Sequence, residues 1–183
     1  MSVSDILRDA ETRMKKSVES GAHDFATLRT GRANPALLDS LRVEYYGQAV
    51  PITQLGTVTV PDARMLLISP WDKGTLGAIE RAIIKSDLGL NPNNDGINIR
   101  LNIPPLTTER RKEFVKQLAT KGEAARVSLR NIRRDAIEQF KRDETITEDD
   151  AKRAEKDVQK FLDKYVAELD ALQKAKEAEL LEN

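Results

Sequence analysis

The sequence predicts an α+β protein in which a long three-helix bundle is interrupted by a small inserted α+β domain. One segment before residue 30 and two after residue 106 place apolar residues three and four positions apart, which is the spacing of a helix that buries one face. The residues between them form short apolar runs separated by glycine and proline, as strands and turns do. We therefore expect a discontinuous bundle of residues 1–30 and 106–183 and an insert of residues 31–105.

The first helix is predicted over residues 1–29, where apolar side chains recur at helical spacing without a proline. Ser2 and Asp5 have the spacing of a capping box, with Asp in place of the usual Glu or Gln. The apolar positions are Val3, Ile6, Leu7, Ala10, Met14, Val18, Phe25 and Leu28.

Two further helices follow the insert. The second is predicted over residues 109–142 after a start signal at Thr107, and Thr147 with Asp150 predicts the cap of the third. Rods of about 50 Å, at ~1.5 Å per residue, can bury their apolar seams only against one another. This requirement favours a three-helix bundle.

The insert is read from shorter patterns. "LRVEYYGQAVPI" predicts a hairpin around Gly47, "TVTVPDARMLLI" predicts two strands and "INIRLNI" one more. "TLGAIERAIIKSDLG" predicts a helix that ends at Gly89, with Ile79, Ala82 and Ile83 as its buried stripe. We expect "NPNNDG" (91–96) to be a turn rather than a calcium loop, and Trp71 to anchor the core of the insert.

Composition excludes several classes of protein. The chain has no cysteine and a single histidine, His23, so disulfide frameworks, thiolate chemistry and multi-histidine zinc sites are excluded. No apolar run is long enough to span a bilayer, and the acidic "MSVSDILRDAE" does not fit a signal peptide. We expect a cytoplasmic monomer without a cofactor or a metal ion, and no catalytic constellation is apparent.

Charge is distributed unevenly although the 30 basic and 30 acidic residues cancel. Residues 107–142 hold 11 basic and 5 acidic residues, whereas residues 143–183 hold 7 and 13. At about 100° per residue, the cations of the second helix gather on one sector away from its apolar stripe, interrupted by Glu123. We call this set the basic ridge: Lys112, Lys116, Arg126, Arg130, Arg133, Arg134 and Lys141.

The basic ridge has two interpretations. It can be a solvated face that the acidic third helix partly neutralises. Alternatively, it can bind a nucleic-acid backbone, because the fork of an arginine matches phosphate oxygens in pairs. Only Asp135 and Glu138 are well placed on the same helix to neutralise the arginine cluster, which favours the second interpretation.

Several strings, in order along the chain, resemble the ribosome recycling factor family over essentially the whole length. They are "RTGRANPALLD" (29–39), "VEYYG" (43–47), "SDLGLNPNNDG" (86–96), "IRLNIPPLTTERRKE" (99–113), "ARVSLRNIRRDA" (125–136) and "DVQKFLDK" (157–164). The link "KRDETITEDD" between the second and third helices is shorter than is usual for the family.

The resemblance implies an L-shaped protein with an outline like that of transfer RNA. Its bundle would lie on the large (50S) subunit of the post-termination 70S ribosome, across the aminoacyl and peptidyl sites. Elongation factor G, by hydrolysing GTP, would then act on it so that the subunits separate. The protein itself would perform no bond chemistry.

The same resemblance assigns residues. Contacts to 23S ribosomal RNA are implied at eight arginines: Arg29, Arg32, Arg110, Arg111, Arg126, Arg130, Arg133 and Arg134, with Arg133 the first choice. A hinge is implied at five positions: Thr30, Gly31, Pro104, Pro105 and Leu106. Glycine tolerates unusual backbone angles while proline stiffens the chain, which suits two connections between moving bodies.

Two other functions remain open. A structural adaptor would use the bundle seam for a partner helix and bind protein independently of salt. An RNA hydrolase is the weakest alternative, because no acids are assembled with His23.

Overall fold

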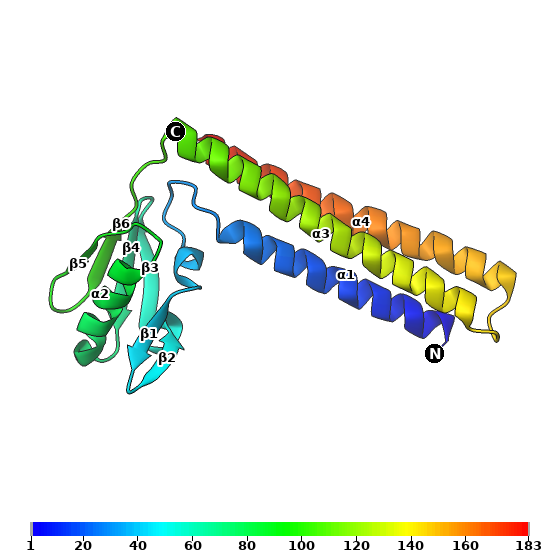
Figure 1. Cartoon of the computed structure of the whole chain (residues 1–183), viewed down its shortest axis with the longest axis horizontal. Helices are drawn as coiled ribbons and strands as arrows, with labels where there is room; N and C mark the ends of the chain where they lie inside the picture. Colours follow the sequence, from blue (N-terminus) through cyan, green and yellow to red (C-terminus); the bar gives the residue numbers. More distant parts are fainter. Residues whose placement is uncertain (1, 183) are drawn as a thin grey trace. The chain divides into compact units, whose positions relative to one another are not determined.

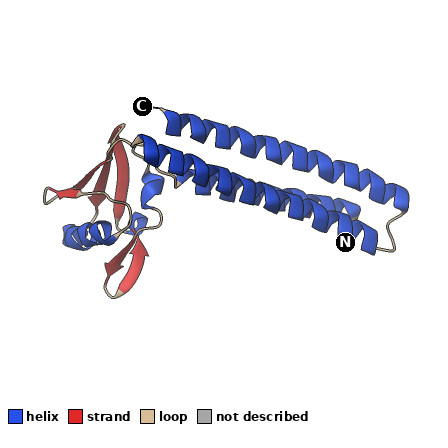
Figure 2. Cartoon of the chain, turned by 45° about the horizontal axis from the view of Figure 1, so that its top comes forward, coloured by secondary structure: helices blue, strands red, loops and turns tan. Residues whose placement is uncertain are grey.

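The computed structural model of the chain describes residues 2–182 and divides into two compact units. The first unit runs to Phe25 and resumes from Glu113 to Glu179, and the second comprises Ala26–Lys112 together with the residues from Leu180 onward. The long helices make up the first unit, and the described strands all lie in the second (Figure 2). The α+β fold class predicted from the sequence is therefore confirmed.

Three helices lie side by side in the first unit: α1 (Val3–Ala26), α3 (Thr108–Arg142) and α4 (Glu148–Leu181). Figure 1 shows α3 running antiparallel to the other two. Met14, Leu129 and Val158, one from each helix, have no exposed surface. Burying an aliphatic side chain of this size stabilises a fold by about 1.5–3 kcal/mol, so the shared seam holds the bundle together.

Gly21 lets α1 approach both other helices closely. A Cβ atom added at Gly21 would lie 2.9 Å from Leu169 Cδ1 of α4 and 3.4 Å from Ala125 Cβ of α3. A larger side chain would therefore push against a fully buried leucine.

The helix starts confirm the caps predicted from the sequence. Ser2 and Asp5 bond reciprocally, because the Ser2 N–H donates to Asp5 Oδ2 at 3.2 Å and the Asp5 N–H to Ser2 Oγ at 3.1 Å. At the start of α4, the Asp150 N–H donates to Thr147 Oγ1 at 3.1 Å. Each bond satisfies a backbone donor that the helix itself leaves unpaired.

The second unit contains one four-stranded antiparallel sheet and one hairpin. The sheet has the order β3 (Gly56–Asp62), β4 (Met65–Pro70), β6 (Ile99–Asn102) and β5 (Pro92–Asn94). The hairpin pairs β1 (Arg42–Tyr45) with β2 (Gln48–Pro51). Three short 3₁₀ helices complete the unit: η1 (Pro35–Leu38), η2 (Ile52–Gln54) and η3 (Lys73–Thr75).

One helix, α2 (Leu76–Lys85), shares a core with the sheet and the hairpin. Alternate residues of a strand point to the same face, so Leu66 and Ile68 of β4 both face the core. Ile79 and Ile83 of α2 fill it from the other side, as predicted, with Ala82 only partly buried. The further core residues are Leu37, Leu38, Leu41, Val43, Ile52, Leu55, Leu76, Leu90, Ile99, Leu101 and Ile103.

Trp71 does not anchor this core, and the prediction that it would was wrong. Its side chain is 69% exposed. Trp71 follows directly after β4, and its backbone N–H donates to the Leu55 carbonyl. Aliphatic side chains from the strands, the hairpin and α2 fill the interior. The buried residues of this core are all aliphatic.

Two boundaries also differ from expectation. "NPNNDG" is only partly a turn, because Pro92–Asn94 forms the edge strand β5, where a proline costs no ladder hydrogen bond on the open side. The helix α2 ends at Lys85 rather than near Gly89, since Ser86 is extended and its hydroxyl donates to the Ile83 carbonyl at 2.6 Å.

Candidate nucleic-acid interface

The basic ridge follows α3 along most of its length, but its members differ in exposure. Two of them, Arg126 and Arg133, are half-buried beside the neighbouring helices. The others are exposed: Lys112, Lys116, Arg130, Arg134 and Lys141. The expectation that the whole ridge faces solvent is therefore wrong for two of its arginines.

Arg126 is held by α4. Its Nη1 donates to Asp170 Oδ1 and to Gln173 Oε1, both at 2.9 Å, and only 21% of its side chain is exposed. Gln173 lies directly over Gly122, where an added Cβ would come within 2.0 Å of its Oε1. The glycine thus makes room for the amide that positions this arginine.

Glu123 binds two arginines of its own helix. Its carboxylate accepts from Arg130 Nη2 at 2.6 Å and from Arg126 Nε at 3.2 Å. These hydrogen bonds, that from Arg130 first, lower the pKa of the Glu123 carboxyl group. Glu123 therefore fixes the directions of two neighbouring guanidinium groups rather than merely interrupting the ridge.

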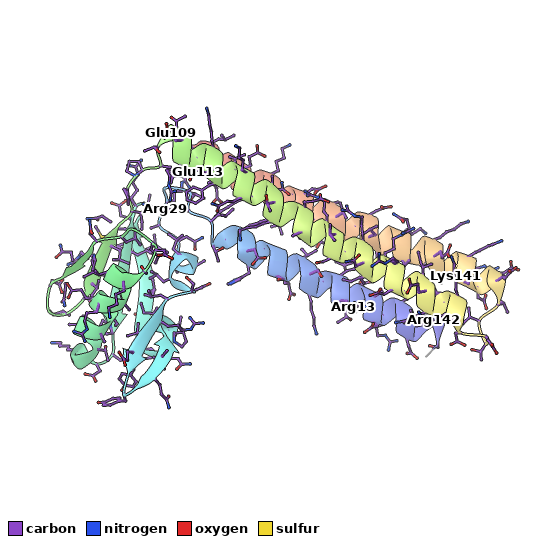
Figure 3. All side chains as sticks on the ribbon, viewed as in Figure 1. Arg13, Arg29, Glu109, Glu113, Lys141 and Arg142 are labelled. Carbon is purple, nitrogen blue, oxygen red and sulfur yellow. The ribbon has the colours of Figure 1, made fainter. Side chains whose placement is uncertain are left out.

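Asp135 and Glu138, which spacing singled out as the only acids well placed to neutralise the arginine cluster, bind other partners. Asp135 accepts from Arg13 Nη2 of α1 at 3.3 Å, and Glu138 lies 3.9 Å from Arg142 Nη2. Figure 3 shows Arg13 on α1 and Arg142 at the end of α3. The acid of α3 that does bind the cluster is Glu123, so singling out Asp135 and Glu138 was wrong.

Several cations of the ridge have no acidic partner. Among the described residues, neither Arg133 nor Arg134 forms an ion pair, and the same holds for Lys112 and Lys116. The Arg133 Nε atom is buried and has no hydrogen-bond partner within the described part of the chain. Because no acidic side chain of the described residues neutralises its charge, the Arg133 guanidinium is a candidate for binding an external anion.

The second unit holds the other four candidate arginines. Arg32 and Arg111 line an open pocket of about 230 Å³ together with Arg64 and Glu182. Glu182 Oε2 lies 2.6 Å from Arg32 Nη2. Arg29 is half-buried and donates to the Leu88 carbonyl at 3.5 Å. Burial, and secondarily the like charge of Arg110, lower the pKa of the Arg29 guanidinium.

The residues predicted as a hinge meet at the same pocket. Gly31 has a φ of 82°, and a Cβ added there would lie 3.6 Å from the Leu106 nitrogen and 4.0 Å from Pro105 Cα. Thr30, Pro105 and Leu106 also line the pocket. The two connections of the chain therefore pass beside each other within this unit.

This arrangement suits the binding of an extended anion. Some guanidinium groups along α3 are held by Glu123, and others have no ion pair among the described residues. Such groups match the phosphates of a nucleic acid, and contacts to phosphates position a protein without reading the base sequence. The described residues contain no cluster of acidic or histidine side chains that could hold a metal ion. Within residues 2–182, no helix is long and apolar enough to cross a membrane.

Sequence reasoning missed the roles of Glu123 and Gln173. The spacing of Glu123 three residues before Arg126 and seven before Arg130 was a usable signal, because such residues share a helix face. No local signal identified Gln173, since its role depends on the register between two antiparallel helices.

Comparison with known proteins gives a consistent result. A family model described as "Ribosome recycling factor" matches residues 22–181. The ribosome-recycling factor of Carboxydothermus hydrogenoformans is 54% identical over 182 residues, covering 98% of each chain. That of Symbiobacterium thermophilum is 55% identical over 181 residues, covering 97% of this chain and 98% of the relative.

Solved structures agree. A solution structure of the ribosome recycling factor aligns with a TM-score of 0.78 and 46% identity, covering 99% of this chain and 98% of that one. Models of the ribosome recycling factor of T. thermophilus and elongation factor G of E. coli, bound to the E. coli post-termination complex, include a chain with a TM-score of 0.70. That chain is 48% identical, with full coverage of both.

Proposed function

Because the chain belongs to the ribosome recycling factor family, we propose that it binds post-termination ribosomes and, with elongation factor G, recycles them. The resemblance of its motifs to this family is confirmed. GTP hydrolysis is performed by elongation factor G, and this chain carries out no bond chemistry. It lies with its bundle on the large subunit, across the aminoacyl and peptidyl sites, and the two subunits then separate.

The observation that supports an RNA contact most strongly is the set of ridge cations left without acidic partners. Arg133 and Arg134 contact ribosomal RNA through phosphate oxygens, and Arg130, directed by Glu123, lies one turn away. Arg126 has a different role, since Asp170 and Gln173 use its donors to join α3 to α4.

The experiment is the sedimentation of post-termination ribosomes with the full chain, alone and with elongation factor G plus GTP. Arg133→Ala should weaken binding to the large subunit at least tenfold, because hydrogen bonds to a charged group contribute about 1.5–3 kcal/mol. Arg153→Ala is the matched control: Arg153 is an exposed arginine of α4 without an ion pair among the described residues. Equal loss in both variants, or no loss in either, would refute the assignment.

Salt dependence separates this function from that of an adaptor. Each phosphate contact contributes a slope of about 0.7–0.9 to the plot of log affinity against log salt concentration. Arg133→Ala should reduce the slope by about one contact. Binding that does not change with salt would favour the adaptor.

The proposed hinge comprises Thr30, Gly31 and residues 104–106. Its support is local: Gly31 has a φ of 82°, where an alanine is strained, and it faces the stiff Pro105–Leu106 segment. Gly31→Ala should preserve ribosome binding but slow subunit separation. Gly89→Ala, also at a positive φ and in open space, is the control. Equal rates of separation in the two variants would argue against a hinge at Gly31.

A further inference from the structure

A second basic surface lies in the second unit, far along the chain from the basic ridge. Arg42 and Glu44 of β1, Gly47 of the hairpin turn and the face of α2 that carries Arg81 and Lys85 line an open groove of about 420 Å³. Ala78 and Ala82 form its floor on the helix side. We call this the hairpin groove.

The two cations that α2 contributes to the hairpin groove are not neutralised by acidic side chains of the described residues. Arg81 and Lys85 are four residues apart on one helix face, where like charges destabilise a helix by about 0.2–0.5 kcal/mol. Neither forms an ion pair among the described residues. Glu80, the acidic residue of α2, instead accepts from Asn94 Nδ2 of β5 at 3.2 Å.

Arg42 is held in place by two hydrogen bonds, and Arg81 lies close to its own helix. Arg42 Nη1 donates to the Asp39 carbonyl at 2.8 Å and to the Leu41 carbonyl at 3.1 Å, which fixes its guanidinium at the groove. Arg81 lies back along α2 over Gly77, where an added Cβ would be 3.3 Å from its Nη1. An arginine fixed before binding loses less conformational entropy when it contacts a phosphate.

An exposed tyrosine directly precedes one of the residues that line the groove. Tyr46 precedes Gly47 in the hairpin turn, is 86% exposed and has a φ of 48°. A bulky residue in the left-handed region is strained, and glycine or asparagine would serve the turn better. The ring packs edge-on against Tyr45, with 4.5 Å between centroids, so it is oriented while most of its surface remains open.

From this combination we propose that the hairpin groove is a second RNA-binding site, which takes a single-stranded segment. Arg42, Arg81 and Lys85 hold its phosphates, and a base stacks on Tyr46. Fixed cations alone would suit an acidic polypeptide equally well. An exposed, oriented aromatic ring next to them favours RNA, because stacking on aromatic side chains is how proteins hold unpaired bases.

The inference rests on the proposed function in taking RNA as the partner, and it gives the insert an RNA contact of its own.

The probe is a fluorescein-labelled single-stranded uridine dodecamer containing 4-thiouridine, crosslinked by ultraviolet light to the full chain. Trypsin separates the two RNA-binding surfaces, since cleavage after Arg42 and Arg64 leaves Tyr46 on peptide 43–64, away from the ridge. Crosslinks mapped to residues 43–50 of this peptide report the groove, because Ala63 and Arg64 at its other end line the pocket of Arg32.

Two variants test the two halves of the site. Arg81→Gln with Lys85→Gln removes phosphate contacts, and Tyr46→Asn removes the ring while keeping a residue that tolerates positive φ. Each should lower the yield of crosslinks to residues 43–50 about fivefold or more, the size of effect expected for lost bonds to a charged group in the first variant and for a lost stacked base in the second. Lys73→Gln with Lys152→Gln removes the same charge from exposed positions outside the groove and should change nothing.

Unchanged crosslinking in the groove variants would overturn the proposal, as would crosslinks confined to peptides of α3. It would also be overturned if polyglutamate displaced the RNA as well as polyuridine does while Tyr46→Asn had no effect, because the groove would then take an acidic polypeptide. These outcomes leave the sedimentation result for Arg133→Ala unaffected. Failure of the groove and failure of the proposed function are therefore distinguishable.

Discussion

Arg126→Ala should destabilise the bundle, whereas Arg134→Ala should not, although the two arginines belong to the same ridge. Arg126 donates to Gln173 in a partly buried bond, which contributes about 1 kcal/mol. Its pairs with Asp170 and Glu123 involve half-exposed carboxylates and contribute about 0.5 kcal/mol each at most. Its stem is largely covered, so lost packing adds a few tenths.

The expected loss for Arg126→Ala is therefore about 2 kcal/mol in the free energy of unfolding. Arg134→Ala, at an exposed position without an ion pair among the described residues, should stay within about 0.5 kcal/mol. Urea unfolding followed by helical circular dichroism measures both values, and urea, unlike guanidinium, does not screen the ion pairs.

A double-mutant cycle with Asp170→Ala isolates the pair and should give a coupling energy of about 0.5 kcal/mol. The reasoning is refuted if Arg126→Ala is no more destabilising than Arg134→Ala. A coupling energy near zero with a full 2 kcal/mol loss would instead place the effect in Gln173 and the packing.

Three further predictions concern pH and packing. Burial first, and then the hydrogen bond to Glu11, raise the pKa of Tyr165 to about 12. Because a tyrosine in the unfolded chain ionises near pH 10, the contribution of Tyr165 to the folding free energy is complete below about pH 10 and should be lost as the pH rises toward 12. Urea midpoints at pH 9 and pH 11.5 should show this loss in the native chain but a smaller one in Tyr165→Phe; equal losses would contradict it. Backbone hydrogen bonds from Asn98 and Ile97, with Arg100, lower the pKa of Asp95 to about 2, so its contribution is present above about pH 4 and lost as the pH falls toward 2. A carbon-13 NMR titration of this carboxyl group with a midpoint near 4 would exclude that environment. A Cβ added at Gly56 would lie 2.4 Å from the Ser69 carbonyl oxygen, so Gly56→Ala should destabilise the second unit by about 3 kcal/mol, measured by urea unfolding. Gly96→Ala, at a φ of 87° in open space, should cost only about 1 kcal/mol, and a similar cost for both would show that strand β4 yields easily.

The helices and most strands could be predicted because their signals are local. The seam through Met14 and the cap at Ser2 depend on spacing within one segment, and the hairpin around Gly47 on one turn. Trp71 and β5 were misjudged because their states depend on distant residues. The aliphatic side chains that form the core instead of Trp71 come from elements spread over residues 37–103, and Pro92–Asn94 becomes a strand only by pairing with β6.

The site shows the same limit more sharply. Which residues are basic, and that they share one side of α3, follows from helical periodicity. Periodicity does not reveal which of these residues are already bonded, because Arg126 meets Asp170 only in one register of α3 against α4.

The opposite charges of α3 and α4 do not cancel along their length. Two acidic residues of α4 meet cations of α3: Asp170 binds Arg126, and Glu155 lies 3.9 Å from Lys141. Arg133 and Arg134 lie between these two cations along α3 and have no acidic partner among the described residues. A chain with equal numbers of acidic and basic residues can therefore carry a local positive field along one helix. The acidic residues of α4 disfavour a polyanion on that helix, so the same distribution that would attract RNA to the basic ridge also restricts its orientation.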